Sequence, residues 1–282
     1  MPMTARRPAP PRVSHAFTSV AMDTGINIQI VTSRARDLVE KDVQRALAWF
    51  DTVERICTRF DPNSEVMQLL EHVGEPVKVS TLLFEAVAFA MDLARQTDGA
   101  FDPTIGAHIE QLGFNTNYRT GEVVQTSVDA GSASYSQVVL DRARRTILLR
   151  RPVILDLNAV AKGLAIDLAS RELHEYPDSY VEAGGDLYVR GHNLAGEAWR
   201  IGIQHPRAAD LLVETLQLSD TAVCTSGDYE RLGHIVDART HQTLTGLASV
   251  TVVAPTAMAA DGLSTAAMAL GLEQGSQFLE RQ

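Results

Sequence analysis

The stretch from Ile154 to Gly163 reads ILDLNAVAKG and carries an acid, an amide and a lysine among small residues. Its lysine, Lys162, is one of only three in a chain whose positive charge comes mostly from arginine, which indicates a need for a compact ammonium group. The layout predicts a strand that runs into a phosphate- or carbonyl-rich ligand site, followed by a helix that presents its N-terminus. A buried strand followed by an ordinary helix with a surface lysine explains the stretch equally well when it is taken alone.

Two further segments combine glycines with acids. Residues 98–106, DGAFDPTIG, bracket an aromatic and an acid with glycines, which permits close approach of the backbone to a ligand. A helix end followed by an Asp-Pro turn accounts for that segment better when it is considered alone. Residues 182–187, EAGGDL, put two glycines inside an expected strand, which is typical of a bulge or of a ligand pressed against the backbone.

Two later segments combine hydroxyl groups with a residue that can transfer a proton or bind a cation. Residues 224–237 contain hydroxyls, glycines and His234, which suits an anion pocket with a general base, although a lone histidine is more often structural. In the last segment Asp261, Ser264 and Thr265 have helical spacing and would share one face. Such a face is a hard-oxygen site for Mg²⁺ with phosphates, or else a helix N-terminus with a capping acid and solvated hydroxyls.

The elements that must position these segments are strands that cluster instead of alternating strictly with helices, which favours an α+β fold over a doubly wound parallel sheet. We expect helices at residues 37–60, 81–97, 164–175 and 257–272, the second of them capped by Ser80 or Thr81. We expect strands at residues 21–31, 138–140, 146–149, 180–189, 199–204, 213–218, 222–226 and 249–254. No linker divides the chain clearly, so we expect one domain over residues 17–282 after a disordered, Pro-rich tail over residues 1–16.

Composition limits the class of protein. The 282 residues carry a formal net charge of −10, which argues against nucleic acid as the main partner and is compatible with divalent cations. The two cysteines, Cys57 and Cys224, lie far apart without a histidine cluster, so we expect buried thiols and no zinc site. The N-terminus is basic and Pro-rich but has no apolar stretch, so we expect neither a signal peptide nor a transmembrane segment, and a cytoplasmic protein.

In their order along the chain, these segments resemble the ApbE family of FAD:protein FMN transferases, from about Ala21 to Gly271. The matching pieces are Arg59–Glu65, Gly99–Thr104, Asp156–Gly163, Gly184–Asp186, Thr225–Tyr229, His234–Asp237 and Ala260–Thr265. Each piece is weak by itself, and together, in the family's order, they make a strong signal. The resemblance implies a layered α/β/α arrangement with mixed, largely antiparallel sheets.

The resemblance also implies an activity, which is Mg²⁺-dependent transfer of FMN from FAD to a Ser or Thr hydroxyl of a target protein, with release of AMP. The acceptor would be a flavoprotein that bears an Asp-x-x-(Ser/Thr)-Gly-Ala-type motif. FAD contacts are implied at Met22, Phe60, Ala100, Phe101, Asp102, Asp156, Lys162 and Ile235. Metal ligands are implied at Ala159, through its carbonyl, and at Asp261, Ser264 and Thr265. The position of His234 is that of the candidate base for the acceptor hydroxyl.

The chain departs from the family's pattern at two of these places. Met22-Asp23-Thr24 stands where the family usually has Met-Gly-Thr, and Asp237-Ala238 stands where an aspartate–proline pair usually follows the histidine. Two alternatives use the same site. One is a Mg²⁺-dependent FAD pyrophosphatase that gives FMN and AMP, with water as the acceptor, and the other is a non-catalytic flavin-binding or assembly protein. The intact Lys162, His234 and Asp261 favour an enzyme.

Overall fold

A six-stranded antiparallel sheet is the centre of the structure, a computed structural model that describes residues 11–229, 236–243 and 246–282. In spatial order its strands are β1 (Val13–Ala21), β2 (Thr24–Thr32), β6 (Ser179–Ala183), β7 (Asp186–Arg190), β10 (Thr221–Gly227) and β13 (Ser249–Ala254). Every neighbouring pair in this sheet is antiparallel. The expected α+β class with largely antiparallel sheets is therefore confirmed.

The strands β1 and β2 form a hairpin whose two-residue turn is Met22-Asp23. Both turn residues have positive φ, 53° and 60°, as the type I′ turn of a tight hairpin requires, and aspartate tolerates this conformation better than most residues. The strand expected at residues 21–31 is thus the second arm of a hairpin, and its alternate isoleucines are buried as its pattern predicts.

Because β1 begins at Val13 and pairs with β2 along its length, the disordered tail expected through residue 16 is wrong for residues 13–16.

A second two-residue turn joins β6 to β7 and corrects the interpretation of the glycine pair. Ala183 pairs with Asp186, so Gly184 and Gly185 are the turn itself, with φ of 60° and 90°. The single strand expected at residues 180–189 is therefore two strands, because paired residues with positive φ reverse the chain. As a result Asp186 begins a strand instead of lying in the middle of one.

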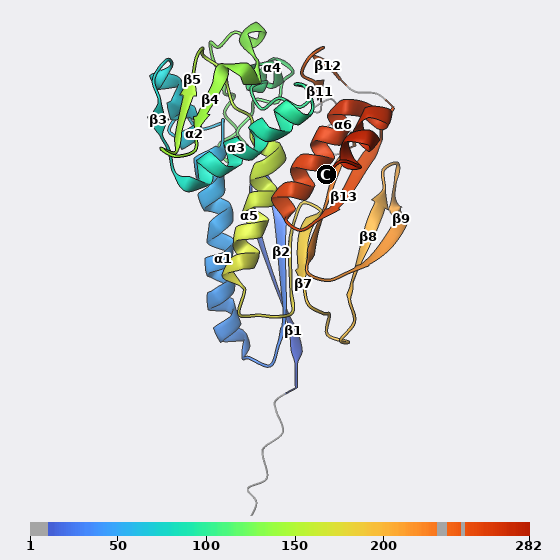
Figure 1. Ribbon diagram of the computed structural model, residues 1–282. Coiled ribbons are helices and arrows are strands. Elements are labelled where there is room, and N and C mark those ends of the chain that lie inside the picture. Colours follow the sequence, from blue (N-terminus) through green and yellow to red (C-terminus); the bar gives the residue numbers. More distant parts are fainter. Residues whose placement is uncertain (1–10, 230–235, 244–245) are drawn as a thin grey trace, which may run out of the picture.

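Three helices cover one face of the sheet, namely α1 (Arg36–Cys57), α5 (Asn158–Glu172) and α6 (Ala257–Leu279) (Figure 1). The strand residues that point toward them, such as Ile28 and Val181, are fully buried, so the main core lies between this helical layer and the sheet. The α6 helix is interrupted at Gly271, whose φ of 77° breaks the helical path near the expected end at residue 272, and it then continues to Leu279.

A hairpin of β8 (Trp199–His205) and β9 (Ala208–Leu218) lies on the other face of the sheet. In a second, smaller core, Trp199 and Ile201 of β8 pack against Leu187, Val189 and Val223 of the sheet. The described layers are therefore helices, sheet and hairpin, which differs on this face from the expected α/β/α order. The physical reason is that an amphipathic hairpin covers apolar strand residues as well as a helix does.

The remaining elements form a smaller lobe at one end of the helices (Figure 1). Its sheet has the order β3 (Val77–Lys78), β5 (Thr146–Leu149), β4 (Val138–Asp141), and the expected hairpin of β4 and β5 is confirmed. Its long helix, α3 (Thr81–Gln96), begins after the expected cap Ser80, whose hydroxyl accepts a hydrogen bond from the Leu83 N–H. Shorter elements are α2 (Glu65–Gln68), α4 (Gly106–Gln111), the 3₁₀ helices η1 (Leu69–His72), η2 (Ala130–Ser132) and η3 (Tyr135–Gln137), and a ribbon of β11 (Val236–Asp237) and β12 (Gln242–Thr243).

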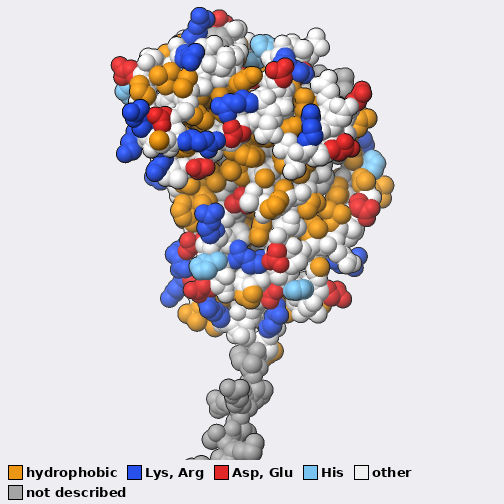
Figure 2. Space-filling view, viewed as in Figure 1, with side chains coloured by type: hydrophobic (Ala, Val, Ile, Leu, Met, Phe, Trp, Pro, Cys, Tyr) orange, Lys and Arg blue, Asp and Glu red, His pale blue; other side chains and the backbone are white. Residues whose placement is uncertain are grey.

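The two cysteines agree with the expectation from the sequence. Figure 2 shows hydrophobic side chains gathered across the middle of the face that carries the helices, with charged side chains toward both ends. Cys57 and Cys224 are buried free thiols, and burial raises the pKa of Cys57 to about 12. Within residues 11–229, 236–243 and 246–282, each helix is too short or too polar to span a bilayer.

The crossing of α5 and α6 depends on Gly163. A Cβ at this position would lie 2.4 Å from the carbonyl oxygen of Ala257, the first residue of α6. We expect Gly163→Ala to lower the free energy of unfolding by about 1–3 kcal/mol, because the backbone of α6 must move to remove the overlap. Urea unfolding followed by circular dichroism measures this loss. The control is Gly25→Ala, whose added Cβ meets nothing within 4 Å, and an equal loss there would contradict the crossing argument.

Candidate functional site

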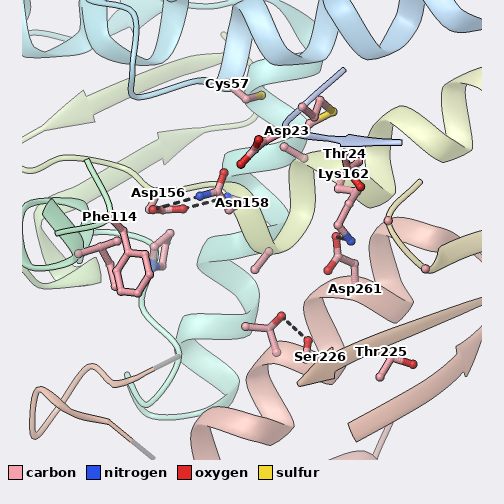
Figure 3. A pocket seen from close by; sticks show the side chains of 18 of the residues that line it. Asp23, Thr24, Cys57, Phe114, Asp156, Asn158, Lys162, Thr225, Ser226 and Asp261 are labelled. Atoms are coloured by element: carbon pink, nitrogen blue, oxygen red, sulfur yellow. Dashed lines mark hydrogen bonds and ion pairs between the residues drawn. The ribbon is translucent and has the colours of Figure 1, made fainter. Parts of the chain in front are cut away.

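A cavity of about 760 Å³ lies at the starts of α5 and α6. The Met22-Asp23 turn, the Gly184-Gly185 turn and strand β10 border it as well. Its volume is within the usual range for small-molecule sites, about 300–1,000 Å³. Most of the expected site residues line it, and these are Met22, Phe60, Phe101, Asp102, Asp156, Ala159, Lys162, Asp261 and Thr265. Figure 3 shows how side chains from segments far apart in the sequence come together around this space.

The start of α5 forms one wall of the cavity. The helix begins at Asn158, earlier than the expected start at Leu164, so Lys162 lies on the helix and not in a turn. The strand expected before it is reduced to an isolated β-bridge at Ile154. The Asp156 carboxylate fixes the first turn, because its Oδ1 accepts a hydrogen bond from the Asn158 N–H at 3.0 Å. The N-terminal end of a helix, which carries the positive end of the helix dipole, thus borders the cavity.

Arg59 holds the Asp156 carboxylate from its other side. The Arg59 Nε lies 2.8 Å from Asp156 Oδ2, and its Nη2 donates to the Phe114 carbonyl. Its guanidinium lies 4.2 Å from the centre of the Phe60 ring, a cation–π distance, and the arginine side chain is 3% exposed. This buried network joins three segments that line the cavity. Sequence reasoning gave Arg59 no role, although a charged residue directly before the implied FAD contact Phe60 was an available signal.

Lys162 connects two carboxylates from different elements, and its ammonium lies beside the Asp261 carboxylate (Figure 3). It forms an ion pair with Asp186 on β7, and its Nζ lies 3.4 Å from Asp261 Oδ2 on α6. Both acidic side chains are buried, and burial raises the pKa of Asp261 while the charge of Lys162 opposes that rise. Asp186 belongs to the motif Gly184–Asp186, but the sequence analysis did not predict a role for it in the site. Its position directly after a two-glycine turn could have identified it.

The first turns of α6 present the oxygen atoms expected around a cation. Asp261 and Thr265 line the cavity, whereas Ser264 is fully buried and lies outside the lining. The Ser264 hydroxyl donates to the Asp261 carbonyl at 2.9 Å and lies 2.8 Å from the Ser226 hydroxyl. Ser226 also lies 2.9 Å from Thr265 Oγ1, so β10 is tied to this face of α6. The helical spacing expected for the three residues is confirmed, and Ser264 supports the wall from behind.

The Asp261 carboxylate also contacts the backbone of α5. The Gly163 N–H lies 3.2 Å from Asp261 Oδ2. In a regular helix this N–H donates to the carbonyl four residues earlier, which belongs to Ala159. Sharing the N–H with Asp261 leaves the Ala159 carbonyl, at the cavity wall, with capacity for another partner.

The segment at residues 98–106 forms a rigid wall of the cavity. The Asp102 carboxylate accepts hydrogen bonds from the N–H groups of Thr104 at 2.8 Å and Tyr135 at 2.7 Å, and burial raises its pKa. This carboxylate therefore holds the local backbone. Ala100 is fully buried and does not line the cavity, whereas Phe101 and Asp102 do. The Ala100 carbonyl accepts a hydrogen bond from the Ala238 N–H at 3.0 Å.

Two expected site residues, His234 and Ile235, lie outside the described residues. Tyr229 and Val236, at either side of positions 230–235, both line the cavity. In the part of the chain that the structure describes, no three His, Cys, Asp or Glu side chains gather into a metal-binding cluster. The oxygen set expected around the cation differs from such a cluster, because it combines one carboxylate, that of Asp261, with hydroxyl and carbonyl groups.

Comparison with known proteins gives one consistent result. A sequence model described as the ApbE family matches residues 22–282. The FAD:protein FMN transferase of Haemophilus influenzae is 28% identical over 264 residues, covering 87% of this chain and 74% of that protein. The enzyme of the same name from Vibrio cholerae is 33% identical over 234 residues, covering 77% and 70%.

Solved structures give the same result. The crystal structure of the ApbE protein from Thermotoga maritima has a TM-score of 0.82 and 28% identity, and the match covers 95% of this chain and 90% of that one. The flavin transferase ApbE from Vibrio cholerae has a TM-score of 0.83 and 26% identity, covering 96% and 92%. The fold described above is therefore similar to that of these proteins over nearly the whole chain.

Lys162→Met removes the ammonium that lies between two buried carboxylates. We expect the free energy of unfolding near pH 7 to fall by about 3–5 kcal/mol, because Asp186 and Asp261 stay buried without this partner. The loss should shrink as the pH is lowered. The pKa of Asp261 is raised in the folded protein, so the folded variant binds protons at a higher pH than the unfolded chain does and gains stability on acidification.

Urea unfolding at about pH 7.5 and about pH 5 measures both effects of this substitution. The matched control is Lys78→Met, because Lys78 is exposed on β3 and its loss should leave stability nearly unchanged. A loss in Lys162→Met that is independent of pH, or one equalled by the control, would contradict the buried ion pair.

Proposed function

The chain belongs to the ApbE family, and from that premise we propose that it transfers FMN from FAD to a Ser or Thr hydroxyl of an acceptor protein, with Mg²⁺ and with release of AMP. One observation carries the proposal. The α5 N-terminus, the Lys162 ammonium and the Asp261 carboxylate meet at one cavity. A helix N-terminus and an ammonium favour a pyrophosphate, and a carboxylate beside them offers a ligand to a cation that phosphates also bind.

The cavity offers suitable surroundings along the length of FAD. Phe60, which stacks on Arg59, and Phe101 supply aromatic walls for the flavin ring. The Met22-Asp23 turn lies beside the β6–β7 turn, since a Cβ on Gly184 would be 2.6 Å from the Thr24 hydroxyl. We expect the adenosine half of FAD at the end of the cavity that these two turns form. The pyrophosphate would then lie between the two halves, at the start of α5.

The oxygen atoms at the starts of α5 and α6 fit Mg²⁺. The candidate ligands are the Asp261 carboxylate, the Thr265 hydroxyl and the Ala159 carbonyl, and all three residues line the cavity. Mg²⁺ prefers hard oxygen ligands of this kind together with substrate phosphates, and when bound it neutralises their developing charge. We propose that Ser264 does not touch the ion, because its hydroxyl is fully buried and donates to the Asp261 carbonyl.

The transfer step exchanges one P–O bond for another. The acceptor oxygen forms a bond to the FMN phosphorus of FAD, the bond from that phosphorus to the bridging oxygen breaks, and AMP leaves. The protein contributes positioning and charge, since the positive end of the α5 dipole and the Lys162 ammonium would hold the pyrophosphate. The acceptor hydroxyl must also lose a proton. We propose that His234 accepts it, because an imidazole has a pKa near neutrality.

The proposed function is tested by incubating the protein with FAD, Mg²⁺ and a carrier protein that bears an Asp-x-x-Thr-Gly-Ala segment. Mass spectrometry of the carrier should show the added mass of FMN, chromatography should show AMP, and EDTA should stop both.

Asp261→Ala should abolish the Mg²⁺-dependent transfer while circular dichroism shows an intact fold. Asp210→Ala, at an exposed acid on β9, is the matched control and should leave transfer unchanged.

Each departure from these results has a distinct meaning. Transfer retained by Asp261→Ala would remove Asp261 from the cation site. Free FMN and AMP with an unlabelled carrier would identify the reaction as FAD hydrolysis. Unchanged FAD with every member of a panel of Thr and Ser carriers would contradict the transfer activity.

His234→Ala should slow transfer by about 10²–10⁴-fold and weaken FAD binding much less, because a general base acts on the acceptor hydroxyl and not on FAD. Single-turnover labelling of the carrier measures the rate, and flavin fluorescence measures FAD affinity. The control is His174→Ala, at an exposed histidine after α5, which should change neither. Equal losses of rate and affinity in His234→Ala would make His234 a binding residue instead of the base.

A further inference from the structure

A second hollow, of about 520 Å³, adjoins the cavity on the outer face of the six-stranded sheet. One wall is the sheet itself, with Gln29 from β2 and Tyr180 from β6, and the other wall is the first half of β8. The residues that line both the hollow and the cavity are Gly185, Ile201 and Gly202. The two spaces therefore adjoin at these three residues, and we call the hollow and the cavity together the groove.

The strand β8 borders this groove with its edge. Residues 199–202 line the hollow and residues 201–204 line the cavity, without the alternation that a strand face would give. Successive side chains of a strand point to opposite faces, so an unbroken run of lining residues means that the backbone edge faces the groove. Among the described strands β8 pairs only with β9, so this edge has no strand partner.

Little in β8 prevents a further strand from pairing there. Natural proteins usually protect an open edge with proline, charge or a bulge. The sequence WRIGIQH has no proline, its register shift lies beyond Ile203, and Gly202 has no side chain at the junction of hollow and cavity. Its one arginine, Arg200, is exposed and is the single charged side chain among residues 199–204.

We propose that this groove binds the acceptor protein, and that an extended acceptor segment pairs with the free edge of β8 as an added strand. The segment would lie in the second hollow and carry its hydroxyl past Gly202 into the cavity. The inference rests on the proposed transfer reaction, which requires a folded protein to deliver one hydroxyl to an enclosed phosphate.

The geometry suits an extended chain better than a folded surface. A strand rises about 3.3 Å per residue, so the edge at residues 199–204 would guide roughly 20 Å of acceptor chain. Main-chain hydrogen bonds to an open edge supply affinity with little demand on sequence, and the wall of the hollow reads alternate side chains. The wall residues Gln29 and Tyr180 are half-buried, so they retain surface for such contacts.

Filling the hollow tests this inference. Gln29→Trp adds bulk in the hollow at a residue that does not line the cavity. We expect the KM for a carrier protein with an Asp-x-x-Thr-Gly-Ala segment to rise at least about tenfold, whereas the affinity for FAD, measured by flavin fluorescence, should stay within about twofold. The matched control is Gln44→Trp on α1, which is exposed on the helical side of the sheet and should change neither value.

Hydrogen exchange tests the strand pairing in the unmodified protein. With FAD present, a carrier that has alanine in place of its acceptor threonine should slow amide exchange in residues 199–205. Residues 208–218 of β9 should exchange as before, because their pairing with β8 does not change.

The results separate the inference from the reaction on which it rests. Wild-type protein that labels the carrier, with a KM unmoved by Gln29→Trp or with no protection of residues 199–205, would overturn the groove and leave the transfer activity standing. Wild-type protein that labels no carrier would overturn both.

Discussion

The ion pairs of Lys162 with Asp186 and Asp261 are the constraint on which the rest of the structure depends. Through them one ammonium ties the start of α5 to β7 and to α6. Two buried carboxylates are unfavourable unless a cation and hydrogen bonds accompany them, and the backbone N–H groups of Gly163 and Thr225 supply those bonds. The same acids would repel a pyrophosphate. A lysine and a metal ion together offset that repulsion, which is why the proposed reaction needs both.

The helix α5 gives this arrangement its geometry. Gly163 and Asp167 lie four residues apart and therefore on one face of the helix. At Gly163 the backbone of α6 approaches too closely for any side chain. At Asp167 a half-buried carboxylate accepts hydrogen bonds from the N–H groups of Ala257 and Met258, at 2.7 and 3.0 Å. These two contacts fix where α6 begins and how it is rotated. The rotation in turn directs Asp261, one turn later, toward the cavity.

Sequence patterns predicted the elements with a strong period and missed the turns that interrupt one. The helix α3, its Ser80 cap and the hairpin of β4 and β5 follow from spacing. The turns at Met22-Asp23 and Gly184-Gly185 were hidden, because a two-residue turn leaves the alternation of the flanking strands nearly unbroken. In the site, helical spacing was enough to bring Asp261 and Thr265 to one cavity. The role of Asp186 depends on a contact with α5 that no local pattern contains.

The two parts of the groove make different demands on stability. The part proposed for FAD is fixed by the buried ion pairs of Lys162 and by the close crossing of α5 and α6 at Gly163. The part proposed for the acceptor must keep a strand edge unpaired until another chain arrives, so pairing cannot hold β8 in place on that side. A two-stranded hairpin is marginal by itself. The hairpin of β8 and β9 is held instead by Trp199, which packs in the second core and donates from its ring nitrogen to the Arg190 carbonyl at 3.0 Å. Packing on the sheet thus keeps an open edge rigid at the mouth of the site, where the register of an added strand would decide which hydroxyl reaches the phosphate.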